Sequence, residues 1–213
     1  MSKHGIIGSC DLIIFDWDGT LNSMRLIMRA NETMKRSLGM WNRDSAIKDV
    51  SSMDYDLKRK LKNEQMKNDL MTYMFDIFLN LSKPRLHNGT VSMLRRIKGS
   101  RKKIAIFTNG SGQRVIRELN ILGIKEYFDA IISARDMHAL KPNPTGIRAT
   151  LKYLKVRPGR CIYIGDMVDD IITAKLAHVH SCAIADGFDS YHKLKSSRPE
   201  YIFRSIEEFS KAL

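Results

Sequence analysis

The sequence lacks the features that would place the protein in a membrane or outside the cell. None of its apolar runs approaches the roughly 20 residues that a membrane-spanning helix needs. We expect no secretory signal in the first residues, MSKHGIIGSC, because Asp11 interrupts the apolar run that follows. The three cysteines, Cys10, Cys161 and Cys182, stand far apart without a C-x-x-C pair, which favours buried, reduced thiols. We therefore expect a cytoplasmic protein with no membrane partner.

The sequence also lacks a tail or tract that concentrates its positive charge, and it has no internal repeats. The 36 Lys and Arg residues exceed the 23 Asp and Glu residues to give a net charge of +13, and the excess is spread along the chain. Such a field favours acidic partners. Because a diffuse excess is a weak indication of nucleic-acid binding, we favour a small phosphorylated substrate over nucleic acid. The sequence leaves the oligomeric state open.

Short apolar runs alternate with amphipathic segments along most of the chain. Continuous rather than alternating apolar residues are typical of parallel strands that are covered on both faces. Such runs occupy residues 12–15, 104–107, 130–132, 161–164, 182–185 and 201–203. Segments 112–124, 144–156 and 169–179 place their apolar residues on one helical stripe. The alternation predicts an α/β fold, a three-layer, doubly wound, Rossmann-like parallel sheet.

Residues 23–84 interrupt this alternation. The region has no clear strand, and it holds eight of the twelve methionines. Charge-rich stretches within it, such as residues 56–81, have the pattern of amphipathic helices. We interpret it as a small α-helical insertion after the first strand. Residues 1–22 and 85–213 then form the α/β core domain.

Polar side chains follow the ends of three predicted strands. Because the carboxyl ends of parallel strands lie at one edge of a sheet, these side chains should meet there. They are Asp16, Asp18, Thr108, Asn109, Asp166, Asp169 and Asp170, accompanied by Lys141 in a loop at the same edge. Gly19 and Gly110 stand among them and would let backbone N–H groups approach a phosphate. Several carboxylates close together repel each other unless a cation is present, and a hard ion such as Mg²⁺ suits oxygen ligands.

Such a set of residues supports phosphoryl transfer. A carboxylate such as Asp16 can attack phosphorus and form an aspartyl-phosphate. Asp18 lies two residues on and should point to a similar side, since strand side chains have a period of two, so it could act as general acid and base. Lys141 and the Thr108 hydroxyl could hold the phosphoryl oxygens, because this chemistry depends mainly on positioning and charge stabilisation.

Four motifs in order make the sequence resemble the haloacid dehalogenase superfamily of phosphohydrolases, especially its phosphoglycolate phosphatase-like branch. They are DWDGT at 16–20, FTNG at 107–110, LKPNP at 140–144 and IGDMVDD at 164–170. A single motif of this kind has limited specificity, but four in order at strand ends are a strong indication. The resemblance covers nearly the whole chain.

The resemblance implies a role for each matching residue. Asp16 would be the nucleophile and a Mg²⁺ ligand, Asp18 the general acid/base with its backbone carbonyl on the metal, and Asp166 the third protein ligand. The substrate phosphate would be bound by Thr108, Asn109 and Lys141, with Asn109 alternatively capping the next helix or orienting the nucleophile. Asp170 would order the metal shell or Lys141, and its spacing favours it over Asp169. Residues 23–84 would form the family's cap domain, which closes over the site and supplies specificity.

We therefore predict a Mg²⁺-dependent phosphohydrolase that acts through an aspartyl-phosphate on Asp16. Its substrate would be a small phosphorylated metabolite, phosphoglycolate-like or a sugar phosphate. A phosphomutase or a pyrophosphatase on the same fold is an alternative, as is a binding or regulatory module without turnover. The complete set of Asp16, Asp18, Lys141 and Asp166 speaks against the last of these.

Overall fold

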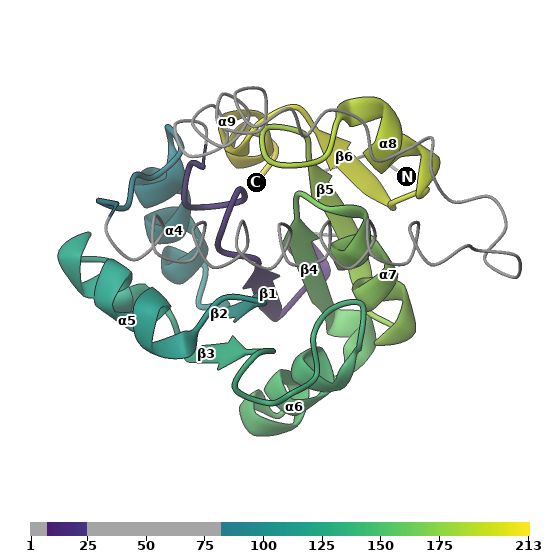
Figure 1. The fold of residues 1–213 in the computed structure, drawn as a ribbon, viewed down its shortest axis with the longest axis horizontal. Coiled ribbons are helices and arrows are strands. Elements are labelled where there is room, and N and C mark those ends of the chain that lie inside the picture. The colour runs from purple at the N-terminus through teal and green to yellow at the C-terminus, as the bar shows by residue number, and fades with distance from the viewer. Residues whose placement is uncertain (1–7, 25–81) are drawn as a thin grey trace, which may run out of the picture. The chain divides into compact units, whose positions relative to one another are not determined.

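In the computed structural model, residues 8–24 and 82–213 are described (Figure 1). The chain divides into two units, Met1–Arg25 with Pro84–Leu213, and Leu26–Lys83. The cap predicted for residues 23–84 lies almost wholly outside the described residues, so it stays a prediction. Within the described ranges, no helix is long and apolar enough to cross a membrane.

Six parallel strands form one sheet in the order β3-β2-β1-β4-β5-β6. Their bounds are β1 Leu12–Phe15, β2 Lys103–Thr108, β3 Ala130–Ser133, β4 Cys161–Gly165, β5 His180–Ile184 and β6 Tyr201–Phe203. All six predicted strands are confirmed. In the register of the sheet, Phe15 pairs with Ile106 of β2 and with Ile164 of β4, so the strands on both sides of β1 reach its carboxyl end.

Helices connect the strands and cover both faces of the sheet (Figure 1). They are α4 Thr90–Gly99, α5 Gly112–Ile121, α6 Thr145–Leu154, α7 Val168–Leu176, α8 Tyr191–Ser196 and α9 Ile206–Lys211, with 3₁₀ turns η1 Lys125–Tyr127 and η2 Pro158–Arg160. The three helices predicted from amphipathic stripes correspond to α5, α6 and α7. Helix α5 stops before the end of its stripe because Gly123, at a φ of +63°, turns the chain into the left-handed region.

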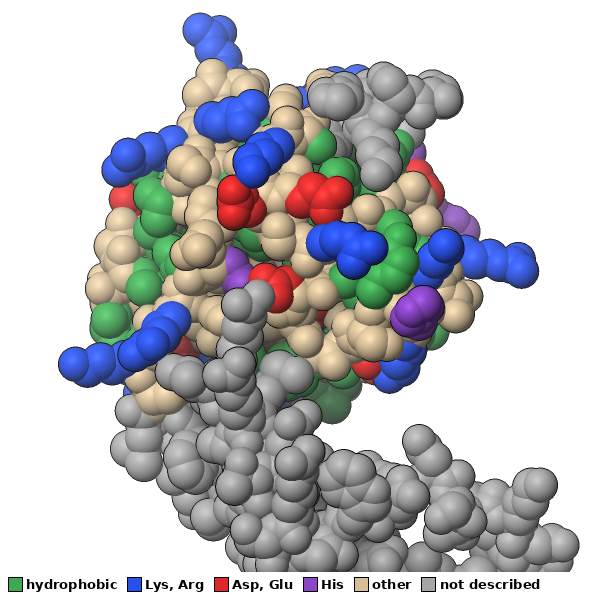
Figure 2. All heavy atoms as spheres, turned by 90° about the horizontal axis from the view of Figure 1, so that it is seen from above, with side chains coloured by type: hydrophobic (Ala, Val, Ile, Leu, Met, Phe, Trp, Pro, Cys, Tyr) green, Lys and Arg blue, Asp and Glu red, His purple; other side chains and the backbone are tan. Residues whose placement is uncertain are grey.

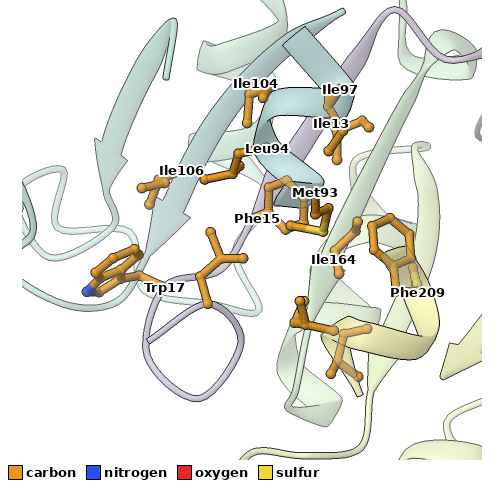
Figure 3. Close-up of a cluster of buried hydrophobic side chains, with 14 of the residues drawn as sticks. Ile13, Phe15, Trp17, Met93, Leu94, Ile97, Ile104, Ile106, Ile164 and Phe209 are labelled. Carbon is orange, nitrogen blue, oxygen red and sulfur yellow. The ribbon is translucent and has the colours of Figure 1, made fainter. Parts of the chain in front are cut away.

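The hydrophobic core has a layer on each face of the sheet. Ile13 and Phe15 of β1 point to the layer formed with α4, α5 and α9, where Phe15 packs edge-to-face on Phe209 with ring centroids 6.3 Å apart (Figure 3). Leu12 and Ile14 point to the opposite layer, which α6 and α7 complete. Burial of each such side chain stabilises the fold by about 1.5–3 kcal/mol. The continuous apolar strands are thus explained by two covered faces, and the three-layer α/β core is confirmed.

Figure 2 shows how charged side chains are distributed on one face of the described residues. On the face seen in Figure 2, Lys and Arg side chains stand apart from one another, and Asp and Glu side chains lie between them. This face of the described residues therefore has no continuous basic stripe of the kind that tracks a nucleic-acid backbone.

The strand order places a topological switch point at β1. The chain builds β2 and β3 on one side of β1 and then crosses over to build β4, β5 and β6 on the other. Ligands of open α/β sheets bind outside the carboxyl ends of the strands at such a switch point. The loops that follow β1, β2 and β4 all open onto it.

Candidate active site

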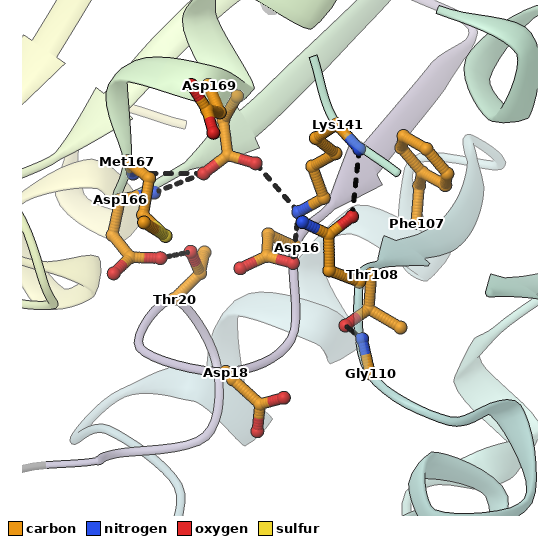
Figure 4. A network of polar contacts seen from close by, with 12 residues as sticks. Asp16, Asp18, Thr20, Phe107, Thr108, Gly110, Lys141, Asp166, Met167 and Asp169 are labelled. Atoms are coloured by element: carbon orange, nitrogen blue, oxygen red, sulfur yellow. Dashed lines mark hydrogen bonds and ion pairs between the residues drawn. The ribbon is translucent and has the colours of Figure 1, made fainter. Parts of the chain in front are cut away.

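Asp16 follows β1 directly and forms a buried ion pair with Lys141. The Lys141 Nζ atom donates to Asp16 Oδ1 at 2.6 Å and to Asp170 Oδ1 at 2.7 Å (Figure 4). Burial raises the pKa of Asp16 to about 7, although the Lys141 charge acts in the opposite direction. Burial alone would lower the pKa of Lys141, but the two carboxylates raise it above its ordinary value, so the ammonium stays charged.

The backbone of Lys141 is held by Asn109, which follows β2, and its ammonium lies near aromatic rings of β2 and β4. Asn109 Oδ1 accepts the backbone N–H of Lys141 at 3.0 Å, and the ammonium lies 5.6 Å and 5.5 Å from the ring centroids of Phe107 and Tyr163. Aromatic faces at such distances attract a cation. The alternative that Asn109 caps the next helix is wrong, because Ser111 occupies the N-cap position of α5. Asn109 instead fixes the backbone from which the lysine reaches the site.

Asp170, in the first turn of α7, has both carboxylate oxygens engaged. Oδ2 accepts the backbone N–H groups of Asp166 at 3.1 Å and of Met167 at 2.9 Å. Oδ1 accepts from the lysine and lies 2.8 Å from the hydroxyl of Tyr163. Asp169 does not belong to the group of converging carboxylates. The structure therefore places Asp170, and not Asp169, beside the lysine, which is one of the two roles that the resemblance implied for it.

Asp166 follows β4 and is enclosed by two loops. Its Oδ1 atom accepts from the Thr20 hydroxyl at 2.7 Å, and its Oδ2 atom accepts from the backbone N–H of Phe188 at 2.7 Å. A Cβ atom at Gly19 would lie 2.3 Å from Asp166 Oδ2, and one at Gly187 would lie 2.0 Å from it. Both positions therefore require glycine. Burial, with two neighbouring carboxylates, raises the pKa of Asp166 well above its ordinary value.

The three buried carboxylates fit a hard divalent cation. Asp16, Asp166 and Asp170 each offer an oxygen atom, and these atoms lie within 4.8 Å of one another. Ionised, they place three negative charges against the single ammonium nearby. Among the described residues, Asp16 Oδ2 has no hydrogen-bond donor, whereas both oxygens of Asp166 and both oxygens of Asp170 already accept hydrogen bonds. An all-oxygen set with uncompensated charge is the donor chemistry that Mg²⁺ prefers.

Asp18 does not point toward this cluster, contrary to expectation. Its carboxylate turns to Arg114 of α5, whose Nη1 atom donates to Oδ1 at 3.0 Å and whose Nη2 atom donates to Oδ2 (Figure 4 shows Asp18 apart from the other carboxylates). The expectation fails because β1 ends at Phe15, so the alternation of a strand does not extend to Asp18. The attraction of a buried guanidinium then decides the direction of the side chain.

Thr108 and Gly110 lie at the end of β2, facing the same edge. The Thr108 Oγ1 atom accepts the backbone N–H of Gly110 at 3.0 Å. Within the described residues, the hydroxyl hydrogen of Thr108 has no acceptor, so it can donate to a ligand. The predicted phosphate contact of Thr108 stays a prediction.

Sequence reasoning missed four contributors to the site. Arg114 and Glu118 lie on α5, Tyr163 lies on β4, and the N–H of Phe188 comes from the loop after β5. The i,i+4 spacing of Arg114 and Glu118 was the one available signal, and it usually marks an exposed pair. Here their side chains are only 5% and 2% exposed.

Comparison with known proteins gives consistent matches over almost the whole chain. Residues 13–184 match the family described as haloacid dehalogenase-like hydrolase. A pyrophosphatase PpaX of Halalkalibacterium halodurans is 25% identical over 202 residues, which cover 92% of this chain and 93% of that protein. A phosphoglycolate phosphatase of Neisseria meningitidis is 27% identical over 216 residues, covering 92% of this chain and 90% of that protein. The crystal structure of a putative phosphatase from Clostridium difficile superimposes with a TM-score of 0.71 at 20% identity, covering 95% of this chain and 98% of that one.

Proposed function

Because the chain belongs to the haloacid dehalogenase-like hydrolase family, we propose that it is a Mg²⁺-dependent phosphohydrolase that uses Asp16 as its nucleophile. The observation that supports this most strongly is the buried group of Asp16, Lys141, Asp166 and Asp170 at the switch point of the sheet. Buried carboxylates are costly unless a positive partner meets them, and one lysine leaves most of their charge uncompensated. A divalent cation bound there would balance that charge and would draw the anionic phosphoryl group to the nucleophile.

The proposed reaction has two steps, each with its proton assigned. In the first, a carboxylate oxygen of Asp16 attacks phosphorus, the bond to the ester oxygen breaks, and Asp18 gives that oxygen a proton. In the second, water attacks the phosphorus and gives its proton to Asp18. The bond to Asp16 then breaks, and inorganic phosphate leaves. Lys141 and Thr108 hold phosphoryl oxygens in both steps.

A bound Mg²⁺ would supply charge neutralisation and alignment of the phosphoryl group. Asp16, Asp166 and the backbone carbonyl of Asp18 are the proposed protein ligands. Asp170 then has two tasks that its contacts support: it holds the Lys141 ammonium, and it receives the N–H groups at the start of α7.

The substrate we propose is a small phosphorylated metabolite in the cytoplasm, phosphoglycolate-like or a sugar phosphate. Matched relatives are named phosphoglycolate phosphatase, which favours a small carboxylated phosphate ester. Other relatives, matched over a similar share of the chain, are named pyrophosphatase PpaX. Inorganic pyrophosphate is therefore the second candidate, because the same nucleophile can displace phosphate as well as an alcohol.

A phosphate-release panel tests the proposal. The compounds are p-nitrophenyl phosphate, phosphoglycolate, several sugar phosphates and pyrophosphate, each with excess Mg²⁺ and with EDTA. We expect Mg²⁺-dependent release by the wild type and none by Asp16→Asn. Asp11→Asn is the matched control, because Asp11 lies at the opposite end of β1 with its side chain half exposed, and this variant should remain active.

Each outcome of the panel has a definite meaning. The ranking of the compounds would distinguish an ester phosphatase from a pyrophosphatase. Isomerised sugar phosphate without phosphate release would instead indicate a phosphomutase. Folded wild-type protein that releases phosphate from no compound and isomerises none would refute the proposal and leave a non-catalytic module.

A further inference from the structure

Arg114 is buried between two carboxylates at the base of the site. One of its nitrogens, Nη1, donates to Asp18 Oδ1 at 3.0 Å and to Glu118 at 3.0 Å and 3.1 Å, while Nη2 donates to Asp18 Oδ2. The guanidinium therefore joins a helix to the loop that follows β1. Residues 18 and 114 lie 96 positions apart in the sequence, so this is a tertiary contact.

Glu118 is itself held in place by Trp17, the residue between the two aspartates of the first motif. Trp17 Nε1 donates to Glu118 Oε2 at 2.6 Å, and the indole is fully buried in the core layer beside α5 (Figure 3). Burial raises the pKa of Glu118, while Arg114 and the indole N–H oppose that effect. The chain of contacts runs from Trp17 through Glu118 and Arg114 back to Asp18, and each step uses a directed hydrogen bond.

The arrangement restrains the Asp18 carboxylate more tightly than a single contact would. A guanidinium presents its N–H groups in a planar fork, and binding both oxygens fixes the plane of the carboxylate as well as its position. Asn22 Nδ2 lies 3.4 Å from Oδ1, whereas Oδ2 is bound by Arg114 alone among the described side chains. A carboxylate oxygen accepts more than one hydrogen bond, so Oδ2 keeps the capacity to exchange a proton.

Stability does not account for this network. Burying a charged group is costly, and apolar residues of similar size are often as stabilising as a buried ion pair. Gly110 also has to be glycine for the fork to fit, since a Cβ atom there would lie 2.3 Å from Arg114 Nη2 and 3.2 Å from Asp18 Oδ2. The Arg114 contacts and the glycine at position 110 both concern the placement of the Asp18 carboxylate.

We propose that Arg114 is the positioning residue for Asp18: its guanidinium, anchored by Glu118, keeps the Asp18 carboxylate apart from the Asp16, Asp166 and Asp170 group, in the orientation from which it exchanges protons with the leaving group and the attacking water. This inference rests on the proposed function, in which Asp18 is the general acid and base. In this proposal Arg114 acts on the reaction only through Asp18. Loss of Arg114 should therefore lower kcat/KM in the same way as loss of Asp18, but to a smaller extent. The decrease should be larger for substrates whose leaving group needs a proton from a general acid.

The test compares two phosphate esters that need a general acid to different degrees. An alkyl phosphate has a poor leaving group that must be protonated as it departs, whereas p-nitrophenyl phosphate has a leaving group that departs readily without a proton. The value of kcat/KM reports the steps up to departure of the leaving group. The variant is Arg114→Lys, which keeps the charge but loses the planar fork. Arg117→Met, an exposed position on the same helix, is the matched control.

We expect Arg114→Lys to lower kcat/KM for the alkyl ester by about 100-fold, because a small misplacement of a catalytic group costs that much, and for the aryl ester by roughly 10-fold or less. The control should match the wild type with both esters. In the Asp18→Asn background, Arg114→Lys should cause no further loss, since there is then no acid to position. The double variant Arg114→Met/Glu118→Gln removes both buried charges together and should show the same selective loss if Arg114→Lys does not fold.

Two results would overturn the inference: an equal decrease of kcat/KM with both esters, or a full further decrease when Arg114→Lys is added to Asp18→Asn. Either would mean that Arg114 only stabilises the fold, and the proposed function would remain intact. A wild-type protein inactive on both esters and on every other compound of the phosphate-release panel would refute the proposed function and with it this inference. Melting temperatures of all variants show that each comparison is made on folded protein.

Discussion

Replacing Lys141 with methionine tests how much the lysine charge stabilises the buried carboxylates, without measuring enzyme activity. Methionine has a similar length and no charge, so Lys141→Met leaves Asp16 and Asp170 without the ammonium that lies 2.6 Å and 2.7 Å from them. The lysine side chain is 5% exposed, so water cannot replace it. Removing one partner of a buried ion pair costs about 3–5 kcal/mol.

The assay is thermal unfolding in EDTA and in excess Mg²⁺. For a chain of this size, each kcal/mol lowers the melting temperature by about 2–4 °C, so Lys141→Met in EDTA should melt roughly 10 °C below the wild type. Mg²⁺ binding stabilises a folded protein by about 2.7 kcal/mol at 100 times its Kd. The variant should gain more than the wild type from Mg²⁺, because the ion offsets the charge that the lysine no longer balances.

An exposed ion pair provides the control. Lys211 contacts Glu207 at 2.8 Å with its side chain 75% exposed, and such pairs often contribute nothing measurable, so Lys211→Met should melt with the wild type in both buffers. The reasoning would be refuted if Lys141→Met melted within about 2 °C of the wild type in EDTA. If Mg²⁺ raised the melting temperatures of Lys141→Met and the wild type equally, the claim that the ion and the lysine balance the same carboxylate charge would be refuted.

Three further measurements test the packing, the electrostatics and a helix end. Gly146→Ala places a methyl group 2.0 Å from the Phe107 ring and should cost about 1–3 kcal/mol in urea unfolding, whereas Gly159→Ala, which meets nothing within 4 Å, should not show this loss. Burial raises the pKa of Asp16 to about 7 from an ordinary value of 3.8, so the folded protein binds this proton more tightly than the unfolded chain does. The contribution of Asp16 to the free energy of unfolding is complete below pH 3.8 and is lost as the pH rises to about 7. In EDTA, the free energy of unfolding of Asp16→Asn should therefore fall less than that of the wild type between pH 5 and pH 8. Equal falls in the two proteins would contradict this. Ser205→Ala removes the side chain that caps α9 and should lower the free energy of unfolding by about 1 kcal/mol, and an unchanged urea midpoint would show that this cap is dispensable.

The strands and the edge that carries the site were predictable because their signals are local. A continuous apolar run such as Leu12–Phe15 has few alternatives to a doubly covered strand, and the position of Asp16 follows from where that run ends. The preference for Asp170 over Asp169 followed from motif spacing. In each case the residues that decide the outcome are close together in the sequence.

The direction of Asp18 could not be predicted, because distant residues decide it. Its partner lies 96 positions away, and nothing in the α5 sequence distinguishes a buried Arg–Glu pair from an exposed one. The buried indole of Trp17 is a similar case, since its hydrogen bond to Glu118 spans 101 positions. Local rules place an element, but the tertiary contacts of its side chains depend on what other elements bring to the same place.

The buried indole of Trp17 also gives the protein an optical reporter. The sequence contains two tryptophans, Trp17 and Trp41, so a Trp41→Phe variant would emit from Trp17 alone. Its N–H is bonded to a carboxylate in the Arg114 network, and its backbone joins the two aspartates of the first motif. Any ligand that moves Asp16 or Asp18 should change the colour or intensity of that emission. Binding at this site can therefore be followed by fluorescence in real time, even with a compound that the protein does not turn over.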